Sequence, residues 1–116
     1  MPYTDVTPEE VRERLACGED VYLLDVRESD EVAEWAYPIG VNIPLSELGD
    51  RLEELPRDRI IVVACAAGNR SATVAAALSA RGWTAENLAG GASAWAASEA
   101  APWSASAGAL FRRTSE

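Results

Sequence analysis

The chain has 116 residues, of which 48% are hydrophobic and 25% are charged, and this composition is typical of one globular domain. Its formal net charge of −9 argues against binding to nucleic acid or to anionic membranes, which attract basic surfaces. The sequence contains no histidine, and arginine supplies all 10 of its basic residues, so serine triads, cysteine–histidine dyads and lysine Schiff bases are excluded.

The first half of the chain alternates helical and extended patterns. Thr7 as N-cap, Pro8 at the first helical position and Glu10 closing a capping box predict a helix that ends at Gly18. The apolar run "VYLLDV" predicts a buried strand. The elements expected after Gly18 are a strand over 21–26, a helix over 28–36, a strand over 40–44 and a helix over 46–55.

The second half contains the clearest patterns, the strand-like "RIIVVA" and the alanine-rich "SATVAAALSARG". The expected elements are a strand over 59–64, a helix over 71–82, a strand within 83–91 and a helix over 92–100. Strands that alternate with helices favour right-handed crossovers and a parallel sheet with helices on both faces. We therefore predict an α/β domain over residues 1–102, followed by a C-terminal tail over 103–116 with the composition of a mobile terminus.

Cys65 directly follows the strongest predicted strand, in the stretch "CAAGNRS" (65–71), and sites in parallel sheets lie beyond the carboxyl ends of strands. A helix is expected to begin at about Ser71, so its unpaired amides lie beside the thiol, and Arg70 adds a cation. Such surroundings lower the pKa of a cysteine from about 8.5 into a range of about 3.5–7.5. The pattern predicts a reactive thiolate; the alternative is a small buried apolar residue.

Four sequence blocks in a fixed order carry a family resemblance. The blocks are "LLDVRESDEVAEWA" (23–36), "VNIPLSEL" (41–48), "CAAGNRS" (65–71) and "NLAGGASAW" (87–95). With them the chain resembles a single-domain rhodanese, a member of the sulfurtransferase family, from Thr7 to about Trp103. The resemblance implies a small rhodanese-like three-layer fold, with a parallel β-sheet flanked by helices on both faces.

The resemblance also implies roles for particular residues. Cys65 is expected to take a sulfane sulfur and hold it as a persulfide before passing it to a thiophilic acceptor. Arg70 is expected to position an anionic donor, while Asp25 and Arg27 form a buried polar pair that supports the loop. Trp95 is expected to belong to the core. The residues expected to bind the donor are Ala66, Ala67, Gly68, Asn69, Arg70 and Ser71.

Two departures from the family pattern bear on activity. Where the family commonly has Gly-His-Ile-Pro-Gly-Ala, this chain reads "WAYPIG" (35–40), so Trp35 and Ala36 replace the glycine and the histidine. Many members have an arginine directly after the cysteine, and this chain has Ala66. Because one cationic contact to a dianion is missing, we expect thiosulfate to be a poor donor, and a persulfide or a protein partner to be a better one.

Two alternative functions remain open at this stage. Phosphatases and arsenate reductases of related architecture have five residues between cysteine and arginine, whereas four residues separate Cys65 from Arg70 here. A non-catalytic interaction module is the second alternative, although such domains usually lose the cysteine or the loop glycine. This chain keeps Cys65, Gly68, Arg70 and Ser71. Cyanide-dependent turnover separates a sulfurtransferase from an interaction module.

The remaining expectations concern surroundings and partners. We find no leader pattern and no apolar run near the roughly 20 residues that span a bilayer, and expect a cytoplasmic protein with reduced thiols. Two cysteines are too few for a structural zinc site, and we expect neither metal nor cofactor. The expected partners are a small sulfur donor and a thiol acceptor, with a protein donor or acceptor as an alternative. Cys17 is given no role.

Overall fold

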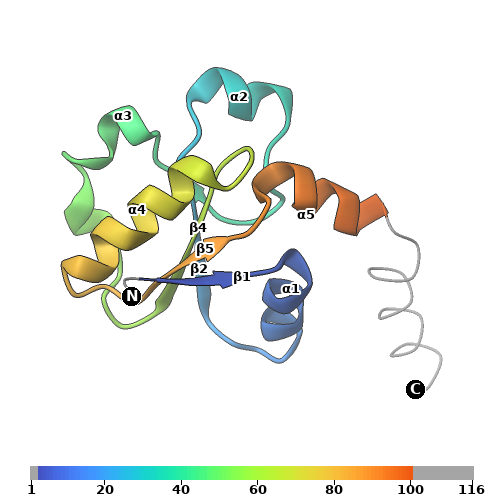
Figure 1. The fold of residues 1–116 in the computed structure, drawn as a ribbon, viewed down its shortest axis with the longest axis horizontal. Helices are drawn as coiled ribbons and strands as arrows, with labels where there is room; N and C mark the ends of the chain where they lie inside the picture. Colours follow the sequence, from blue (N-terminus) through green and yellow to red (C-terminus); the bar gives the residue numbers. More distant parts are fainter. Residues whose placement is uncertain (1–2, 101–116) are drawn as a thin grey trace.

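The structure is a computed structural model, and it describes residues 3–100. A five-stranded parallel sheet with the strand order β1-β5-β4-β2-β3 forms its centre (Figure 1). The strands are β1 (Thr4–Val6), β2 (Val21–Asp25), β3 (Val41–Asn42), β4 (Ile60–Ala64) and β5 (Ala85–Leu88). The helices are α1 (Pro8–Ala16), α2 (Ser29–Glu34), α3 (Leu45–Leu48), the 3-10 turn η1 (Leu52–Glu54), α4 (Asn69–Ala80) and α5 (Gly91–Ala100).

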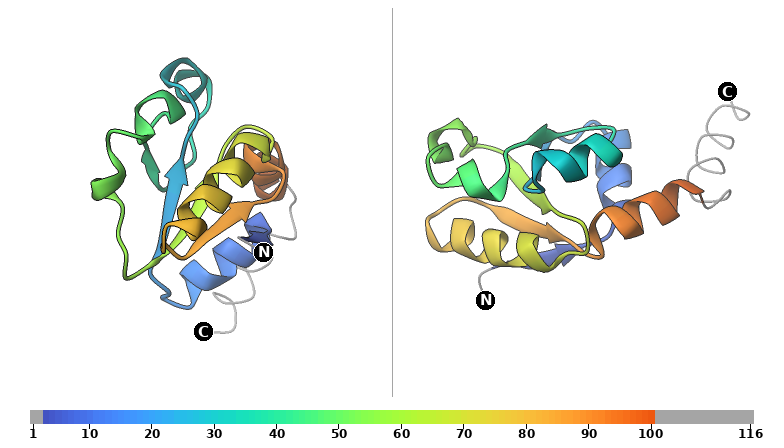
Figure 2. Two further views of the ribbon diagram at one scale, coloured as in Figure 1. Left: turned by 60° about the vertical axis from the view of Figure 1, so that its left-hand side comes forward. Right: turned by 90° about the horizontal axis from the view of Figure 1, so that it is seen from above.

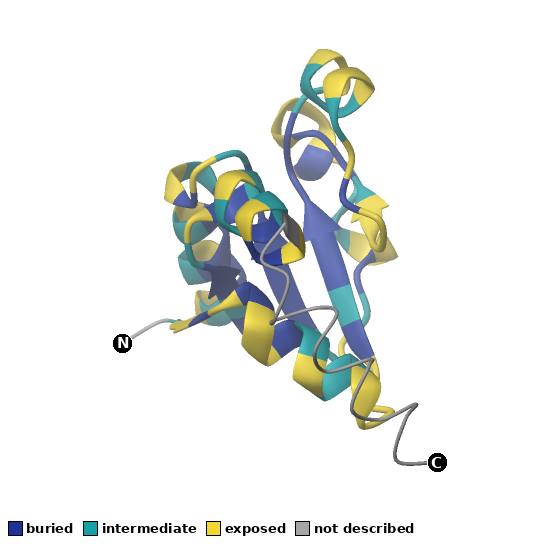
Figure 3. Cartoon of the chain, turned by 90° about the vertical axis from the view of Figure 1, so that its right-hand side faces the viewer, coloured by how far each residue is buried: buried dark blue, intermediate teal, exposed yellow. Residues whose placement is uncertain are grey.

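Helices cover both faces of the sheet, as the views in Figure 2 show. Successive residues of β4 point to opposite faces, so Ile61 and Val63 belong to one core cluster while Val62 and Ala64 belong to another. The first cluster is closed by α3 and α4, and the second by α1 and α5. The central strands β2, β4 and β5 are therefore largely buried, and the exposed residues lie on the helices, the loops and the edge strands β1 and β3 (Figure 3). This architecture confirms the predicted α/β class.

The register of the sheet brings three chain segments to one edge. Asp25 at the end of β2 lies opposite Ala64 at the end of β4, and Val63 lies opposite Asn87 of β5. Because the strands are parallel, the segments that leave them all begin at the same edge. The loop that starts at Cys65 therefore lies between the segment after Asp25 and the segment after Leu88.

Several element predictions are confirmed and others differ in position. Strand β1 was not expected, because three residues carry little pattern and their pairing partner β5 is far away in the sequence. The single helix predicted over 46–55 is two pieces, α3 and η1, separated by a turn at Gly49–Arg51. Helix α4 starts at Asn69, two residues before the predicted start at Ser71. The predicted tail over 103–116 lies outside the described residues.

Helix α1 shows how local sequence determines an element end. The Thr7 hydroxyl accepts the N–H of Glu10, and the Glu10 carboxylate accepts the N–H of Thr7, as the capping-box pattern predicts. Cys17 forms the other end and is exposed. None of the described helices is long and apolar enough to cross a membrane.

Candidate active site

The loop from Cys65 to Ser71 joins β4 to α4 and curls around the sulfur of Cys65. Gly68 has a φ of +97°, which is a left-handed conformation that glycine adopts without strain. This turn directs two backbone amides at the thiol, with Gly68 N at 3.1 Å and Ser71 N at 3.4 Å from Cys65 Sγ. Cys65 itself is 1% exposed. All six predicted donor-binding residues therefore lie in one turn around a buried sulfur.

This loop changes the ionisation of Cys65. Burial raises the pKa of the thiol, but hydrogen bonds from the Ser71 hydroxyl and from the amides of Ser71, Gly68 and Ala67 outweigh burial and lower the pKa below its ordinary value. These donors are neutral groups at the start of α4, where the helix dipole adds partial positive charge. The predicted thiolate is thus stabilised by main-chain amides and one hydroxyl, without a histidine.

A chain of side-chain hydrogen bonds runs from Cys65 to strand β1. The Ser71 hydroxyl lies 3.2 Å from Cys65 Sγ and donates to Asn87 Oδ1 at 2.6 Å, and Asn87 Nδ2 donates to Asp5 Oδ1 at 2.9 Å. Because a carboxylate only accepts, Asp5 fixes which end of the Asn87 amide faces Ser71. Ser71 has one proton, so while it donates to Asn87 it can only accept from the Cys65 thiol. Ionisation of Cys65 therefore favours a turn of this hydroxyl toward the sulfur.

The backbone carbonyl of Cys65 is held from two other segments. Tyr37 donates its hydroxyl to Cys65 O at 2.7 Å, and Ala92 donates its N–H to the same oxygen at 2.8 Å. Gly91 has a φ of +57°, and a Cβ at this position would meet Cys65 O at 2.5 Å and Ala66 C at 2.7 Å. Only glycine fits here without displacing the loop, which gives a physical reason for the glycine pair in "NLAGG".

Asp25 and Arg27 form the buried pair that was predicted. Arg27 is 3% exposed and Asp25 is 4% exposed, and Arg27 Nη2 lies 2.8 Å from Asp25 Oδ2 while Arg27 Nε lies 3.0 Å from Asp25 Oδ1. The guanidinium of Arg27 also lies over the Tyr37 ring, 5.1 Å from its centroid. The pair therefore contacts the residue that holds the Cys65 carbonyl, and its link to the loop is indirect.

The guanidinium of Arg70 faces Glu31 of α2. Arg70 Nη2 lies 2.7 Å from Glu31 Oε1, and Arg70 Nη1 lies 2.8 Å from Glu31 Oε2. The hydrogen bonds from Arg70, with a further one from the Glu28 amide, lower the pKa of Glu31 to about 2. The pKa of Arg70 is raised, chiefly by Glu31 and to a smaller extent by Cys65. The predicted donor-positioning arginine thus already binds an anion that belongs to the chain.

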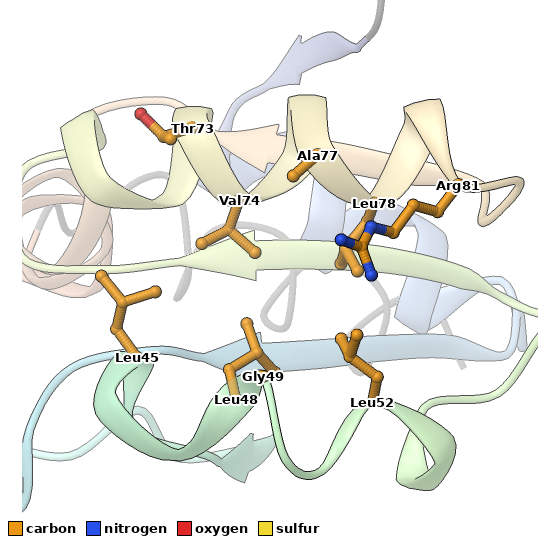
Figure 4. A pocket seen from close by; sticks show the side chains of 9 residues that line it. All are labelled: Leu45, Leu48, Gly49, Leu52, Thr73, Val74, Ala77, Leu78 and Arg81. Carbon is orange, nitrogen blue, oxygen red and sulfur yellow. The ribbon is translucent and has the colours of Figure 1, made fainter.

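Two hollows differ in their relation to the loop. A hollow of about 300 Å³ lies beside Ala66, between α2 and α5. A second hollow of about 330 Å³ lies between α3 and α4, and its lining includes Leu45, Leu48, Val74 and Leu78 (Figure 4). This second lining is apolar apart from Thr73 and Arg81. Of these two hollows, the one beside Ala66 therefore adjoins the loop that starts at Cys65.

Comparison with known proteins agrees with this geometry, because residues 7–98 match the family described as Rhodanese-like domain. The chain belongs to the rhodanese-like domain family. It is 34% identical over 95 residues to a Bacillus subtilis protein named "Putative sulfurtransferase YtwF", covering 82% of this chain and 92% of the relative. An Allochromatium vinosum protein named "Sulfurtransferase" is 37% identical over 93 residues, and the match covers 79% of this chain and 87% of the relative. The crystal structure of a rhodanese-like domain protein from Staphylococcus aureus matches this structure with a TM-score of 0.75 at 34% identity. The match covers 79% of this chain and 90% of that protein.

In this rhodanese-like domain, two aromatic side chains of the block "WAYPIG", which departs from the family pattern, pack against each other, and one of them packs against Trp95. Trp35 and Tyr37 meet edge to face, with ring centroids 5.0 Å apart, and Tyr37 meets Trp95 in the same way at 5.7 Å. Arg27 lies 5.5 Å from the centroid of the Trp35 ring. Replacement of the glycine and histidine at Trp35 and Ala36 is therefore accompanied by an aromatic cluster beside the loop. Trp95 is 2% exposed, and its predicted place in the core is confirmed.

Sequence reasoning missed four residues of this rhodanese-like site: Glu31, Tyr37, Asn87 and Asp5. Glu31 looks like one of several carboxylates in an acidic helix, and Tyr37 stands in the block that departs from the family pattern. Asn87 belonged to a quoted block, but nothing in the sequence linked its amide to Ser71. Cys17 lies at the end of α1, outside this set of contacts. The described residues contain no group of three or more His, Cys, Asp or Glu that could hold a metal ion.

Proposed function

We propose that this domain is a sulfurtransferase that carries a sulfane sulfur as a persulfide on Cys65. The observation that supports the proposal is the convergence of the Gly68 and Ser71 amides on Cys65 Sγ, at 3.1 and 3.4 Å. Amides in this arrangement stabilise an anion at the centre of the loop. They suit both a thiolate before the reaction and a negatively charged terminal sulfur after it.

In the first step the Cys65 thiolate attacks the outer sulfur of a donor. A new S–S bond forms on Cys65 while the donor's own S–S bond breaks, and its electron pair leaves with sulfite from thiosulfate or with a thiolate from an organic persulfide. In the second step cyanide in vitro, or a thiolate acceptor, attacks the terminal sulfur and releases the Cys65 thiolate. Charge is conserved in each step, and no external oxidant or reductant is needed.

The surrounding residues have distinct proposed roles. The amides of the loop, from Ala66 to Ser71, bind the transferred sulfur. Asp25 and Arg27 support the loop by way of Tyr37. Because the chemistry needs a free thiolate at Cys65, a reducing compartment suits it, and we place the domain in the cytoplasm. A small sulfur donor and a thiol acceptor are its proposed substrates, with a protein as an alternative donor or acceptor.

Intact-mass measurement tests the proposal. We expect incubation with thiosulfate or a small persulfide to add the mass of one sulfur atom, and cyanide to remove it as thiocyanate. Cys65→Ser is expected to abolish the gain, whereas Cys17→Ser is expected to retain it. A sulfur that still adds to the Cys65→Ser variant would refute the mechanism.

The non-catalytic alternative makes the opposite prediction for the same experiment. An interaction module with this fold would show no mass gain from any donor and no thiocyanate release. The phosphatase or arsenate reductase alternative predicts turnover of an aryl phosphate or of arsenate instead. With four residues between Cys65 and Arg70, the loop is one residue shorter than those enzymes use, which favours the sulfurtransferase.

A further inference from the structure

Glu31 is held in position by its own surroundings as well as by Arg70. Its Oε2 accepts the N–H of Glu28 at 3.1 Å. The Glu28 carboxylate in turn accepts the N–H of Ser46 at 3.2 Å and its hydroxyl at 2.9 Å. Segments before and after β3 thus fix the carboxylate that faces Arg70. The ion pair is therefore preorganised. It is also accessible to a ligand, because 30% of the Glu31 side chain and 37% of the Arg70 side chain are exposed.

The other charges around the hollow beside Ala66 provide no replacement cation among the residues of its lining. Arg27 lines this hollow but is buried and bidentate to Asp25. Glu34 also lines the hollow and is exposed, so it adds a negative charge. Position 66 itself is an alanine. The lining of this hollow therefore combines an arginine that is already paired with the exposed carboxylate of Glu34, while Arg70 is paired with Glu31.

These charges disfavour a donor with two negative charges. Thiosulfate is a dianion, and to make its own bidentate contact with Nη1 and Nη2 of Arg70 it must displace Glu31 from these two nitrogens. A thiol persulfide carries at most one charge, and it also carries a carbon chain. Apolar atoms of Trp35, Ala92 and Ala96 line the hollow of about 300 Å³ and offer such a chain a surface to cover.

We propose that Glu31 is a specificity-determining residue, which keeps Arg70 from binding dianionic donors and thereby selects organic persulfides as sulfur donors. This inference rests on the proposed sulfurtransferase function. In the selected reaction the Cys65 thiolate bonds to the outer sulfur of R–S–SH, the S–S bond of the donor breaks, and its electron pair leaves with the inner sulfur as a thiolate, R–S⁻. The charge lost from the Cys65 thiolate reappears on this leaving group.

Steady-state kinetics with two donors test the proposal. The donors are thiosulfate and 2-hydroxyethyl persulfide, with cyanide as acceptor. Glu31→Gln keeps an oxygen that can accept the Glu28 N–H, but it removes the charge that holds Arg70. We expect the ratio of kcat/KM for thiosulfate to kcat/KM for the persulfide to rise about tenfold, since a charge-assisted contact becomes available to the dianion.

Two control variants separate release of Arg70 from a change in net charge. Asp30→Asn removes the same charge from the same helix, at an exposed position outside the hollow, without freeing Arg70, and it should change the ratio by less than about twofold at physiological salt. In the double variant Glu31→Gln/Arg70→Ala the gain for thiosulfate should vanish. An equal gain in Glu31→Gln and Asp30→Asn, or a gain that survives loss of Arg70, would overturn the role of Glu31.

A binding measurement keeps this inference separate from the proposed function. Calorimetric titration of thiosulfate into the Cys65→Ser variant reports anion binding without sulfur transfer. Adding Glu31→Gln to that variant should tighten binding about tenfold. Unchanged binding would refute the competition by Glu31. If binding tightens but no donor adds sulfur to Cys65 in the wild type, the sulfurtransferase proposal fails and the donor selection falls with it.

Discussion

Cys65 and Arg70 belong to one loop, yet their side chains lie in two different environments. The Cys65 sulfur lies against an inner wall made of the Gly68 and Ser71 amides, the Ser71 hydroxyl and, behind it, Asn87. Arg70 belongs to an outer rim, where its partner is the carboxylate of Glu31. The inner wall is neutral, buried and largely main chain, whereas the outer rim is charged and about one-third exposed.

On the proposed function, this difference separates two tasks of the loop, namely binding of the transferred sulfur and selection of the donor. Main-chain amides do not depend on side-chain identity, so the inner wall is preserved as long as the turn keeps its shape. The outer rim depends on two side chains, Arg70 and Glu31, so on the proposed function a single substitution should change which anions it accepts. We therefore expect backbone changes to remove sulfur transfer altogether, and rim changes to alter the choice of donor.

The largest effect is expected from a change that displaces the inner wall. In Gly91→Ala the new Cβ would overlap Cys65 O and Ala66 C, so the loop must move. We expect sulfur transfer to fall at least about 100-fold, because small misplacements of reacting groups cost this much. The free energy of unfolding should fall by about 3 kcal/mol, measured by urea denaturation.

Gly18→Ala is the matched control for backbone strain alone. Gly18 has a φ of +84°, and nothing lies within 4 Å of a Cβ placed there. The Gly18→Ala variant should lose about 1–2 kcal/mol in its free energy of unfolding and keep the wild-type rate of sulfur transfer. Equal rates in the two variants would show that close approach of Gly91 to the loop is unimportant for activity.

The next effect concerns the direction of the Ser71 hydroxyl in the inner wall. Iodoacetamide reacts with the thiolate, so its rate rises with pH through the pKa of Cys65. Ser71→Ala removes a donor that lowers this pKa, and its alkylation profile should move to higher pH by about one unit. Asp5→Ala releases the Asn87 amide to turn, which frees the Ser71 proton for the sulfur, and its profile should move to lower pH by about half a unit.

Asp5→Asn distinguishes orientation from charge in this experiment. Its side-chain oxygen can still accept from Asn87 Nδ2, while the negative charge is gone. If hydrogen-bond direction is the cause, its profile stays near that of the wild type. Equal shifts in Asp5→Asn and Asp5→Ala would mean that the charge of Asp5, rather than the Asn87 amide, acts on Cys65. The sulfur of Cys65 faces Ser71, and it also interacts electrostatically with Tyr37 and Arg70, which stay unchanged in these variants.

The smallest effect on sulfur transfer is expected from a change at Tyr37, which lies behind the inner wall. Tyr37→Phe removes the hydrogen bond of 2.7 Å to Cys65 O, but that oxygen keeps its bond from Ala92. We expect a loss of about 1 kcal/mol in the free energy of unfolding and a roughly threefold slower sulfur transfer. Tyr22→Phe, on half-buried Tyr22 of β2, is the control and should leave the transfer rate unchanged. Equal rates for both variants would contradict a positioning role for Tyr37.

The inner wall and the sheet were more accessible to sequence reasoning than the outer rim. The order of strand, glycine loop and helix follows from local patterns, so the strand of "RIIVVA" and the loop at Cys65 were correctly placed, and the helix after them was predicted two residues late. The bond of Arg70 to Glu31 joins residues 39 positions apart, and Asn87 meets a residue 82 positions away in Asp5. Such contacts depend on the register of the sheet, which local pattern does not specify.

The broken helix before β4 shows a second limit. The stretch "SELGDRLEEL" has helical composition, yet the chain turns between Leu48 and Leu52. Arg51 bonds to Glu47 on one side of this turn and to Glu54 on the other, at 2.8 Å in both cases. A continuous helix would also pair these charges, so spacing alone does not distinguish the two forms. The apolar contact of Leu48 and Leu55 with the core favours the bent one.

The carbonyl of Cys65 receives its two hydrogen bonds from Tyr37 and from Ala92, which stand 28 residues before it and 27 residues after it. The reactive loop therefore reaches its final geometry only when segments on both sides of it have docked. During synthesis on the ribosome, a chain that has just exposed Cys65 carries a thiol without the surroundings described here. On the proposed function, Cys65 therefore gains the geometry that binds sulfur only late in folding, after the segment around Ala92 has docked.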